Sequence, residues 1–325
     1  MHPAFSVIFL TTLLGAGQGL FLAIFTGQLY SVARFLPTQD DQFYALGSLV
    51  ALVLLVVGLG ASFFHLGRPE RAWRSAAMWR TSWLSREVIL LPILMLLVFA
   101  YGVAHWMEWT QPWFRIGEVL NVDATLIFGL LGAIASFALF VATAMIYASV
   151  KFLQEWHSTF TVANFTLLGM ASGFMLAAAY SAYIGNPLVA FFGTWAVVLT
   201  LGALVSRVAH LRRNAWLKHK STVQTAIGVR HTAVVQKAQG AMGGSFNTRE
   251  FFHGRSDSIV RLVRNSFLIL VFPVPILLIS AAYLIESTSL PILAFVIQYL
   301  GLIAERWYFF AEAKHPQNLY YQSVA

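Results

Sequence analysis

His65 and Glu87 are the two side chains of this sequence whose type and spacing best suit proton chemistry. They stand at the two ends of a short polar stretch, 65–87, that joins two long apolar runs. An imidazole changes its charge near neutral pH, and a carboxyl group partly removed from water can hold or release a proton in the same range. A helix N-terminus favours the ionised carboxylate instead, so the charge state of Glu87 stays open. A structural alternative also stays open, in which Glu87 pairs with an arginine and His65 caps a helix end.

The stretch between these two residues is rich in arginine and tryptophan. It carries five arginines and three tryptophans, whereas the runs 43–64 and 88–107 on either side contain no Asp, Glu, Lys or Arg. At 1.5 Å per residue, each run is long enough to cross a hydrocarbon core of about 30 Å. Tryptophan suits the headgroup layer, where its ring can be half apolar and half wet. The sequence therefore predicts a polar connection at a membrane surface, with His65 and Glu87 at one depth.

A lipid-soluble redox ligand suits such a position. A quinone takes up two electrons and two protons, so its site needs a hydrogen-bond donor and groups that pass protons to water. His65 and Glu87 are the main candidates, and we add Trp83 from the connection and Gln18 from the first apolar run. Asn164, a second polar residue within an apolar run, either faces the same pocket or bonds between helices.

The composition is that of an integral membrane protein. The chain has 325 residues, of which 58% are hydrophobic and 10% are charged, against about 25% charged in soluble domains. It has no cysteine, which excludes disulfides, thiolate iron–sulphur ligation, c-type haem attachment and a cysteine nucleophile within this chain. The first residues lack the basic region and cleavage site of a secretory signal, so we expect the first apolar run to remain as a helix.

The apolar runs predict an all-α bundle of eight transmembrane helices that forms one transmembrane domain, 1–325. A break at 185–187 divides the long run 156–206 into two spans, and Pro273 and Pro275 are expected to kink the seventh. No segment alternates in the manner of a strand. The expected spans are 4–33, 43–64, 88–107, 124–150, the two halves of 156–206, 265–285 and 289–304.

The basic residues are distributed unevenly between the two ends of this bundle. With eight spans both termini share one side, here called side A, and 19 of the 21 Lys and Arg residues fall there. Arg34 and Arg115 fall on the opposite side, side B. The positive-inside rule makes side A cytoplasmic. The sequence thus predicts a multi-pass protein of the bacterial inner membrane with both termini in the cytoplasm.

The long basic loop 207–264 is a candidate docking segment. It holds 11 basic and 2 acidic residues, and a loop of this length is uncommon unless it has a function. Phe246, Phe251 and Phe252, with Arg249, suit a protein partner. The alternative is that the loop binds anionic membrane lipids. The charge alone would also fit nucleic acid, which we do not expect for a membrane protein.

Haem and metal sites are not expected in this chain. No pair of histidines stands at helical ligand spacing within a span, and His105 is the single histidine toward side B. Haem b usually needs two histidines that face each other across a bundle.

Several segments resemble the membrane anchor subunit of dimethyl-sulfoxide-reductase-type molybdoenzymes. They are HLGRP at 65–69, WRTSWLSRE at 79–87, GSFNTREFFHG at 244–254 and ERWYFFAEAKHPQN at 305–318. The likeness covers essentially the whole chain, and the opening MHPAFSVI resembles the anchors of the sulfite-oxidising branch. The resemblance implies an eight-helix bundle without haem that exchanges electrons between quinone, menaquinone or ubiquinone, and an iron–sulphur subunit, which is linked in turn to a molybdopterin catalytic subunit. It also adds Arg86 to the quinone candidates His65 and Glu87.

Together these observations predict a quinone-reactive anchor that takes part in an oxidoreductase complex without performing the molybdenum chemistry. With side A cytoplasmic, sulfite oxidation coupled to quinone reduction fits best. The alternatives are a quinol-oxidising anchor of a dimethyl sulfoxide reductase or another terminal reductase, a purely structural anchor, and a secondary transporter with a broken helix at Pro273 and Pro275.

Overall fold

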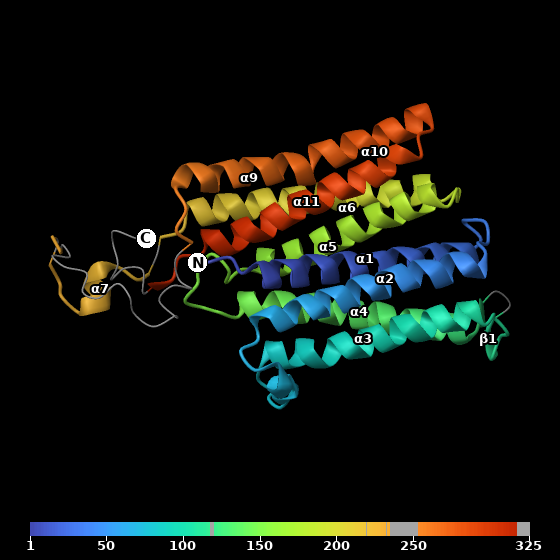
Figure 1. Cartoon of the computed structure of the whole chain (residues 1–325), viewed down its shortest axis with the longest axis horizontal. Helices are drawn as coiled ribbons and strands as arrows, with labels where there is room; N and C mark the ends of the chain where they lie inside the picture. The colour runs from blue at the N-terminus through green and yellow to red at the C-terminus, as the bar shows by residue number, and fades with distance from the viewer. Residues whose placement is uncertain (118–119, 219, 232, 235–252, 317–325) are drawn as a thin grey trace.

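The computed structural model describes residues 1–117, 120–218, 220–231, 233–234 and 253–316 (Figure 1). Within these residues, eight helical spans are long and apolar enough to cross a membrane, which confirms the predicted all-α bundle. The long helices are α1 (Phe5–Val32), α2 (Asp41–Ser62), α3 (Trp83–Trp106), α4 (Ala124–Ala148), α5 (Thr159–Tyr183), α6 (Val189–Ala215), α9 (Asp257–Val271), α10 (Pro273–Ile285) and α11 (Ser289–Glu312).

Successive spans run in alternating directions along the bundle. Figure 1 places the N-terminus, the connection between α2 and α3, and the end of α11 at one end of the molecule, which corresponds to side A. The short 3-10 helices η1 (Phe63–His65) and η2 (Pro69–Ala76) lie in that connection, and α7 (Val223–Ile227) follows α6 at the same end. An even number of spans therefore brings the candidate side chains of the sequence to one end of the bundle.

The seventh span consists of two helices, α9 and α10, that meet at Phe272. The backbone of Phe272 has φ −109° and ψ −77°, and Pro273 and Pro275 follow it at the start of α10. A proline ring lacks an N–H group and collides with the preceding turn, so the helical hydrogen-bond ladder breaks here. The kink predicted from the two prolines is confirmed.

Three span boundaries predicted at charged residues are wrong. Helix α6 continues to Ala215 instead of ending at 206, α9 begins at Asp257 instead of 265, and α11 continues to Glu312 instead of ending at 304. The apolar count stops at the first charged side chain, but a helix can continue past one when that side chain finds a partner inside the bundle. Arg207 and Glu305, each next to a predicted end, are partners of this kind.

Helix α1 lies at the centre of the bundle and is mostly buried. It packs against α2, α4, α5 and α11, and its contact with α5 depends on facing glycines. A methyl group on Gly173 of α5 would overlap the backbone of Gly19 on α1, and one on Gly19 would overlap the backbone of Gly169. Small residues allow helix backbones to approach this closely within a membrane.

The side-B end carries a short hairpin that the sequence did not predict. Strand β1 (Phe114–Ile116) pairs antiparallel with β2 (Leu120–Val122). Three residues are too few to show an alternating pattern. Near this end the buried ring of His105 holds the Asp41 carboxylate, with 2.6 Å between Nδ1 and Oδ1. This contact ties α3 to the start of α2.

Candidate functional site

His65 lies at the side-A surface, beside a groove between α1 and α2. It is the last residue of η1, and its side chain is exposed. The groove has a volume of about 560 Å³ and is lined by Ser6, Phe9, Leu13, Val57, Gly60, Ala61 and Phe64. Its last lining residue, Phe64, directly precedes His65. An imidazole thus stands where an apolar groove of the bundle meets the polar surface.

Arg86 fastens the connection 65–87 to the start of α3. Its Nε donates to the backbone carbonyl of Trp79 at 3.0 Å, and its Nη2 donates to that of Arg80 at 2.8 Å. Its guanidinium also lies over the Trp83 ring, 4.1 Å from the ring centroid. Both side chains therefore hold the shape of the loop beside His65.

Glu87 faces the interior of the bundle. Its side chain is buried, and its Oε1 accepts a hydrogen bond from Thr143 Oγ1 of α4 at 2.5 Å. Ser82 caps α3, and Glu87 follows in its second turn. The open question of whether Glu87 pairs with an arginine is answered within the described residues, where its hydrogen-bond partner is a hydroxyl group.

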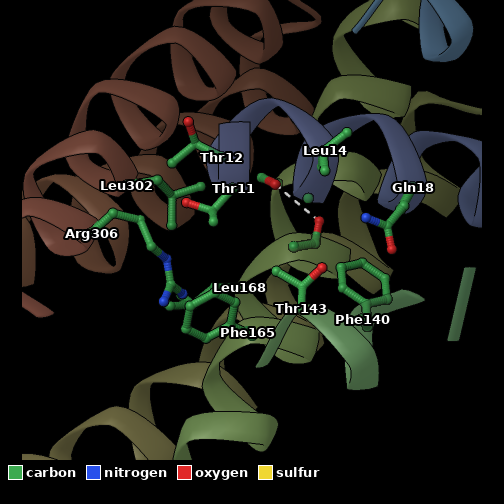
Figure 2. A pocket seen from close by; sticks show the side chains of 13 residues that line it. Thr11, Thr12, Leu14, Gln18, Phe140, Thr143, Phe165, Leu168, Leu302 and Arg306 are labelled. Atoms are coloured by element: carbon green, nitrogen blue, oxygen red, sulfur yellow. Dashed lines mark hydrogen bonds between the residues drawn. The ribbon is translucent and has the colours of Figure 1, made fainter. Parts of the chain in front are cut away.

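Gln18 lines a small closed cavity between α1, α4, α5 and α11. Figure 2 shows Gln18 and Thr143 on one side of this cavity and Arg306 on the other. The cavity has a volume of about 20 Å³. Because Thr143 both lines the cavity and contacts Glu87, two of the sequence candidates belong to this interior site.

The groove and the cavity lie on different faces of α1. Ser6, Phe9 and Leu13 line the groove, whereas Thr11, Gly15 and Gln18 line the cavity. Residues three or four apart share one face of a helix, so these two series point in different directions. The structure therefore divides the five candidates, with His65, Arg86 and Trp83 at the surface and Glu87 and Gln18 in the interior.

A cluster of charged side chains lies behind the cavity. Arg306 forms part of the cavity wall, and its Nε lies 3.2 Å from Oε2 of Glu305. The other carboxylate oxygen of Glu305 lies 2.8 Å from Nε of Arg207 on α6. All three side chains are buried. The three together carry one net positive charge.

The cluster continues toward side A through His210. Its Nδ1 lies 3.0 Å from Asn164 Nδ2 and 3.3 Å from an Arg207 nitrogen, and its Nε2 lies 2.9 Å from the Glu155 carbonyl. The Asn164 side chain thus belongs to this cluster. In our sequence interpretation these charged residues counted only toward the charge of side A. The available signal was that Arg207 and Glu305 stand directly at the ends of apolar runs.

The proposed docking residues Phe246, Arg249, Phe251 and Phe252 lie outside the described residues. Their role stays a prediction from the sequence.

Comparison with known proteins identifies the family. Residues 1–309 match the family model described as DMSO reductase anchor subunit (DmsC). The chain belongs to the DmsC family. The chain is also 77% identical, over all 325 residues and the full length of both chains, to a membrane-anchor homologue named as part of the sulfite dehydrogenase of Allochromatium vinosum. The resemblance inferred from the motifs is confirmed, and the eight spans are those of a DmsC-family membrane anchor.

Proposed function

We propose that this anchor subunit transfers electrons from an iron–sulphur partner subunit to quinone within a sulfite-oxidising molybdoenzyme complex. The observation that carries the proposal is the position of His65 at the mouth of the apolar groove between α1 and α2. The connection 65–87 holds this histidine at the side-A surface, where a partner protein can approach.

The groove fits a lipid-soluble ring and tail. Pockets for small molecules are mostly apolar and measure about 300–1,000 Å³, and the groove, at about 560 Å³, is lined by apolar side chains apart from Ser6. A quinone reaches its site from the lipid, so a groove on the flank of the bundle suits its entry. An imidazole at the mouth supplies one polar contact that orients the head of the molecule.

The residues of the chain divide the work as follows. His65 donates a hydrogen bond to a quinone carbonyl and exchanges a proton with it, since imidazole titrates near neutral pH. Glu87 takes part in passing protons toward side A. Arg86 and Trp83 keep the loop in place, and quinone supplies the two-electron, two-proton chemistry when it is bound. The electrons arrive from the partner on side A.

Sidedness and substrate follow from the charge distribution and the relative. Because 19 of the 21 basic residues lie on side A, this side faces the cytoplasm of a bacterial inner membrane. The relative with 77% identity is named for sulfite oxidation. Cytoplasmic sulfite oxidation with electron flow outward to quinone fits both facts. The iron–sulphur subunit docks on loop 207–264, and the molybdopterin subunit binds to it in turn.

The test is made on the native complex, purified through a tag on this chain. We expect molybdenum and iron to copurify with it, and we expect sulfite-dependent reduction of a water-soluble quinone analogue in liposomes. A preparation without either metal would favour a transporter. A complex that contains both metals and oxidises sulfite with a dye, but reduces no quinone, would make this chain a structural anchor. Faster quinol oxidation than quinone reduction would reverse the direction of electron flow.

A further inference from the structure

Two buried polar atoms in the wall of the small cavity lack hydrogen-bond partners among the described residues. They are the amide oxygen Oε1 of Gln18 and the guanidinium nitrogen Nη1 of Arg306. The Gln18 side chain is 1% exposed and that of Arg306 is 3% exposed. Buried polar groups are nearly always hydrogen-bonded, and leaving one unpaired is costly. An acceptor and a donor in one cavity wall indicate a small polar ligand between them.

The size of the cavity selects water as that ligand. A cavity needs about 10–15 Å³ to hold one water molecule, together with two to four polar partners. This cavity measures about 20 Å³, and the hydroxyl groups of Thr143 and Ser172 contribute to its wall beside Gln18 and Arg306 (Figure 2). A quinone ring is several times larger than this space.

The direction of the hydrogen bonds is fixed by chemistry. Thr143 spends its single hydroxyl hydrogen on Glu87, so its oxygen is left to accept a hydrogen bond. Arg306 can only donate. A water between them therefore accepts from Arg306 and donates to Thr143, and its second hydrogen is available for Gln18. Every bond in this chain points toward the Glu87 carboxylate.

We propose that Arg306 and Gln18 hold a water molecule in this cavity, and that the water, through Thr143, lets the positive charge of Arg306 stabilise an ionised Glu87 inside the membrane. The role of this water in quinone reduction rests on the function proposed above. In that reaction Glu87 gives its proton to the reduced quinone, becomes a carboxylate, and regains a proton from side-A water. The two electrons come from the iron–sulphur partner. Thr143, Gln18 and Arg306 are positioning residues, because they act through Glu87.

The charge of the surroundings makes this stabilisation possible. A buried carboxylate is costly unless it is paired or hydrogen-bonded. The cluster Arg207–Glu305–Arg306 keeps one positive charge after its internal pairing. Hydrogen bonds in a chain polarise one another, so a chain that ends on a guanidinium is stronger than an isolated hydroxyl contact.

The test compares Thr143→Val with Thr143→Ser in the assembled complex. Valine has nearly the shape of threonine but lacks the hydroxyl group, whereas serine retains it. The measurement is the infrared carbonyl band of a protonated carboxyl group at neutral pH, assigned to Glu87 by its loss on adding Glu87→Gln. We expect no such band from Glu87 in the wild type or in Thr143→Ser, and we expect it to appear in Thr143→Val. The quinone-linked rate of Thr143→Val should fall about 10- to 100-fold, the equivalent of one hydrogen bond to a charged group.

Gln18→Leu provides a second variant of similar volume, and it should produce the same band because the water loses its oriented acceptor. Thr26→Val is the matched control, since the hydroxyl of Thr26 bonds to the carbonyl of Leu22 in its own helix. A Glu87 band that is already present in the wild type, or that is absent from both Thr143→Val and Gln18→Leu, overturns the proposal. The band does not depend on turnover. A wild-type complex that reduces no quinone would therefore contradict the proposed function and still leave the infrared comparison decisive.

Discussion

Arg207 on α6 and Glu305 on α11 form an ion pair with 2.8 Å between Nε and Oε1, and both side chains are shielded from solvent. The pair joins two helices that are 98 residues apart by sequence position at these sites, and it lies in the side-A half of the bundle. Two groups that would each be costly alone in an apolar interior are tolerated together. This relationship explains why both helices continue beyond the ends that hydropathy predicts.

Removing one member of this pair should destabilise the protein. Arg207→Met should lower the free energy of unfolding by about 3–5 kcal/mol, because it leaves the Glu305 carboxylate buried with one remaining partner, Arg306. Adding Glu305→Gln to this variant should restore part of the loss. The measurement is denaturant-induced unfolding in detergent, with Arg212→Met as the control, since Arg212 is exposed on the same helix. Equal losses in the two arginine variants would show that the pair has no special role.

The glycine contact between α1 and α5 gives a second stability prediction. Gly173→Ala should separate the two helices, because the added methyl group meets the backbone of Gly19 and a backbone cannot move aside as a side chain does. Overpacking of this kind costs about 1–3 kcal/mol or more. Gly202→Ala is the control, since a methyl group there meets nothing, and it should change stability little. The thermal unfolding midpoints of the two variants in one detergent decide the matter, and similar midpoints would argue against the close contact.

His65→Phe tests the surface part of the quinone site. Phenylalanine keeps a ring at the mouth of the groove but removes both nitrogens, so the hydrogen bond to quinone is lost while the bulk remains. The loss of such a bond corresponds to about a 10- to 100-fold decrease in quinone affinity. The measured quantity is the ratio of quinone-linked to dye-linked sulfite oxidation, because a dye that reacts at the molybdenum subunit bypasses this chain. If the ratio is unchanged, His65 only caps η1 and the search moves to Asn164 and Tyr147.

The orientation in the membrane can be tested with reporter fusions. A reporter that is active only in the periplasm should give no signal when fused to Ala325, because the basic residues place side A in the cytoplasm. A fusion that ends at Gly117, in the connection between α3 and α4 at side B, should give a strong signal and serves as the matched control. The opposite pattern would reverse the sidedness and remove the argument for a cytoplasmic catalytic arm.

The sequence by itself determined the number of spans, their alternation and the kink at Phe272. Runs of more than 20 apolar residues have no stable place except in lipid, and two prolines interrupt a helix in any tertiary context. Two chemically distinctive segments, 65–87 and 305–318, were enough to indicate the family. These features depend on local composition and backbone chemistry, so no knowledge of packing is needed to predict them.

The tertiary structure alone decided which candidates meet. Glu87 finds its partner Thr143 56 positions further along the chain, and Gln18 shares a cavity with Arg306 while His65 stands beside a groove on another face of α1. In transmembrane helices that are apolar on every side, periodicity does not reveal which face turns inward. That choice depends on how closely the helices pack, as at Gly19 and Gly173, and on which buried charges find one another, as Arg207 and Glu305 do.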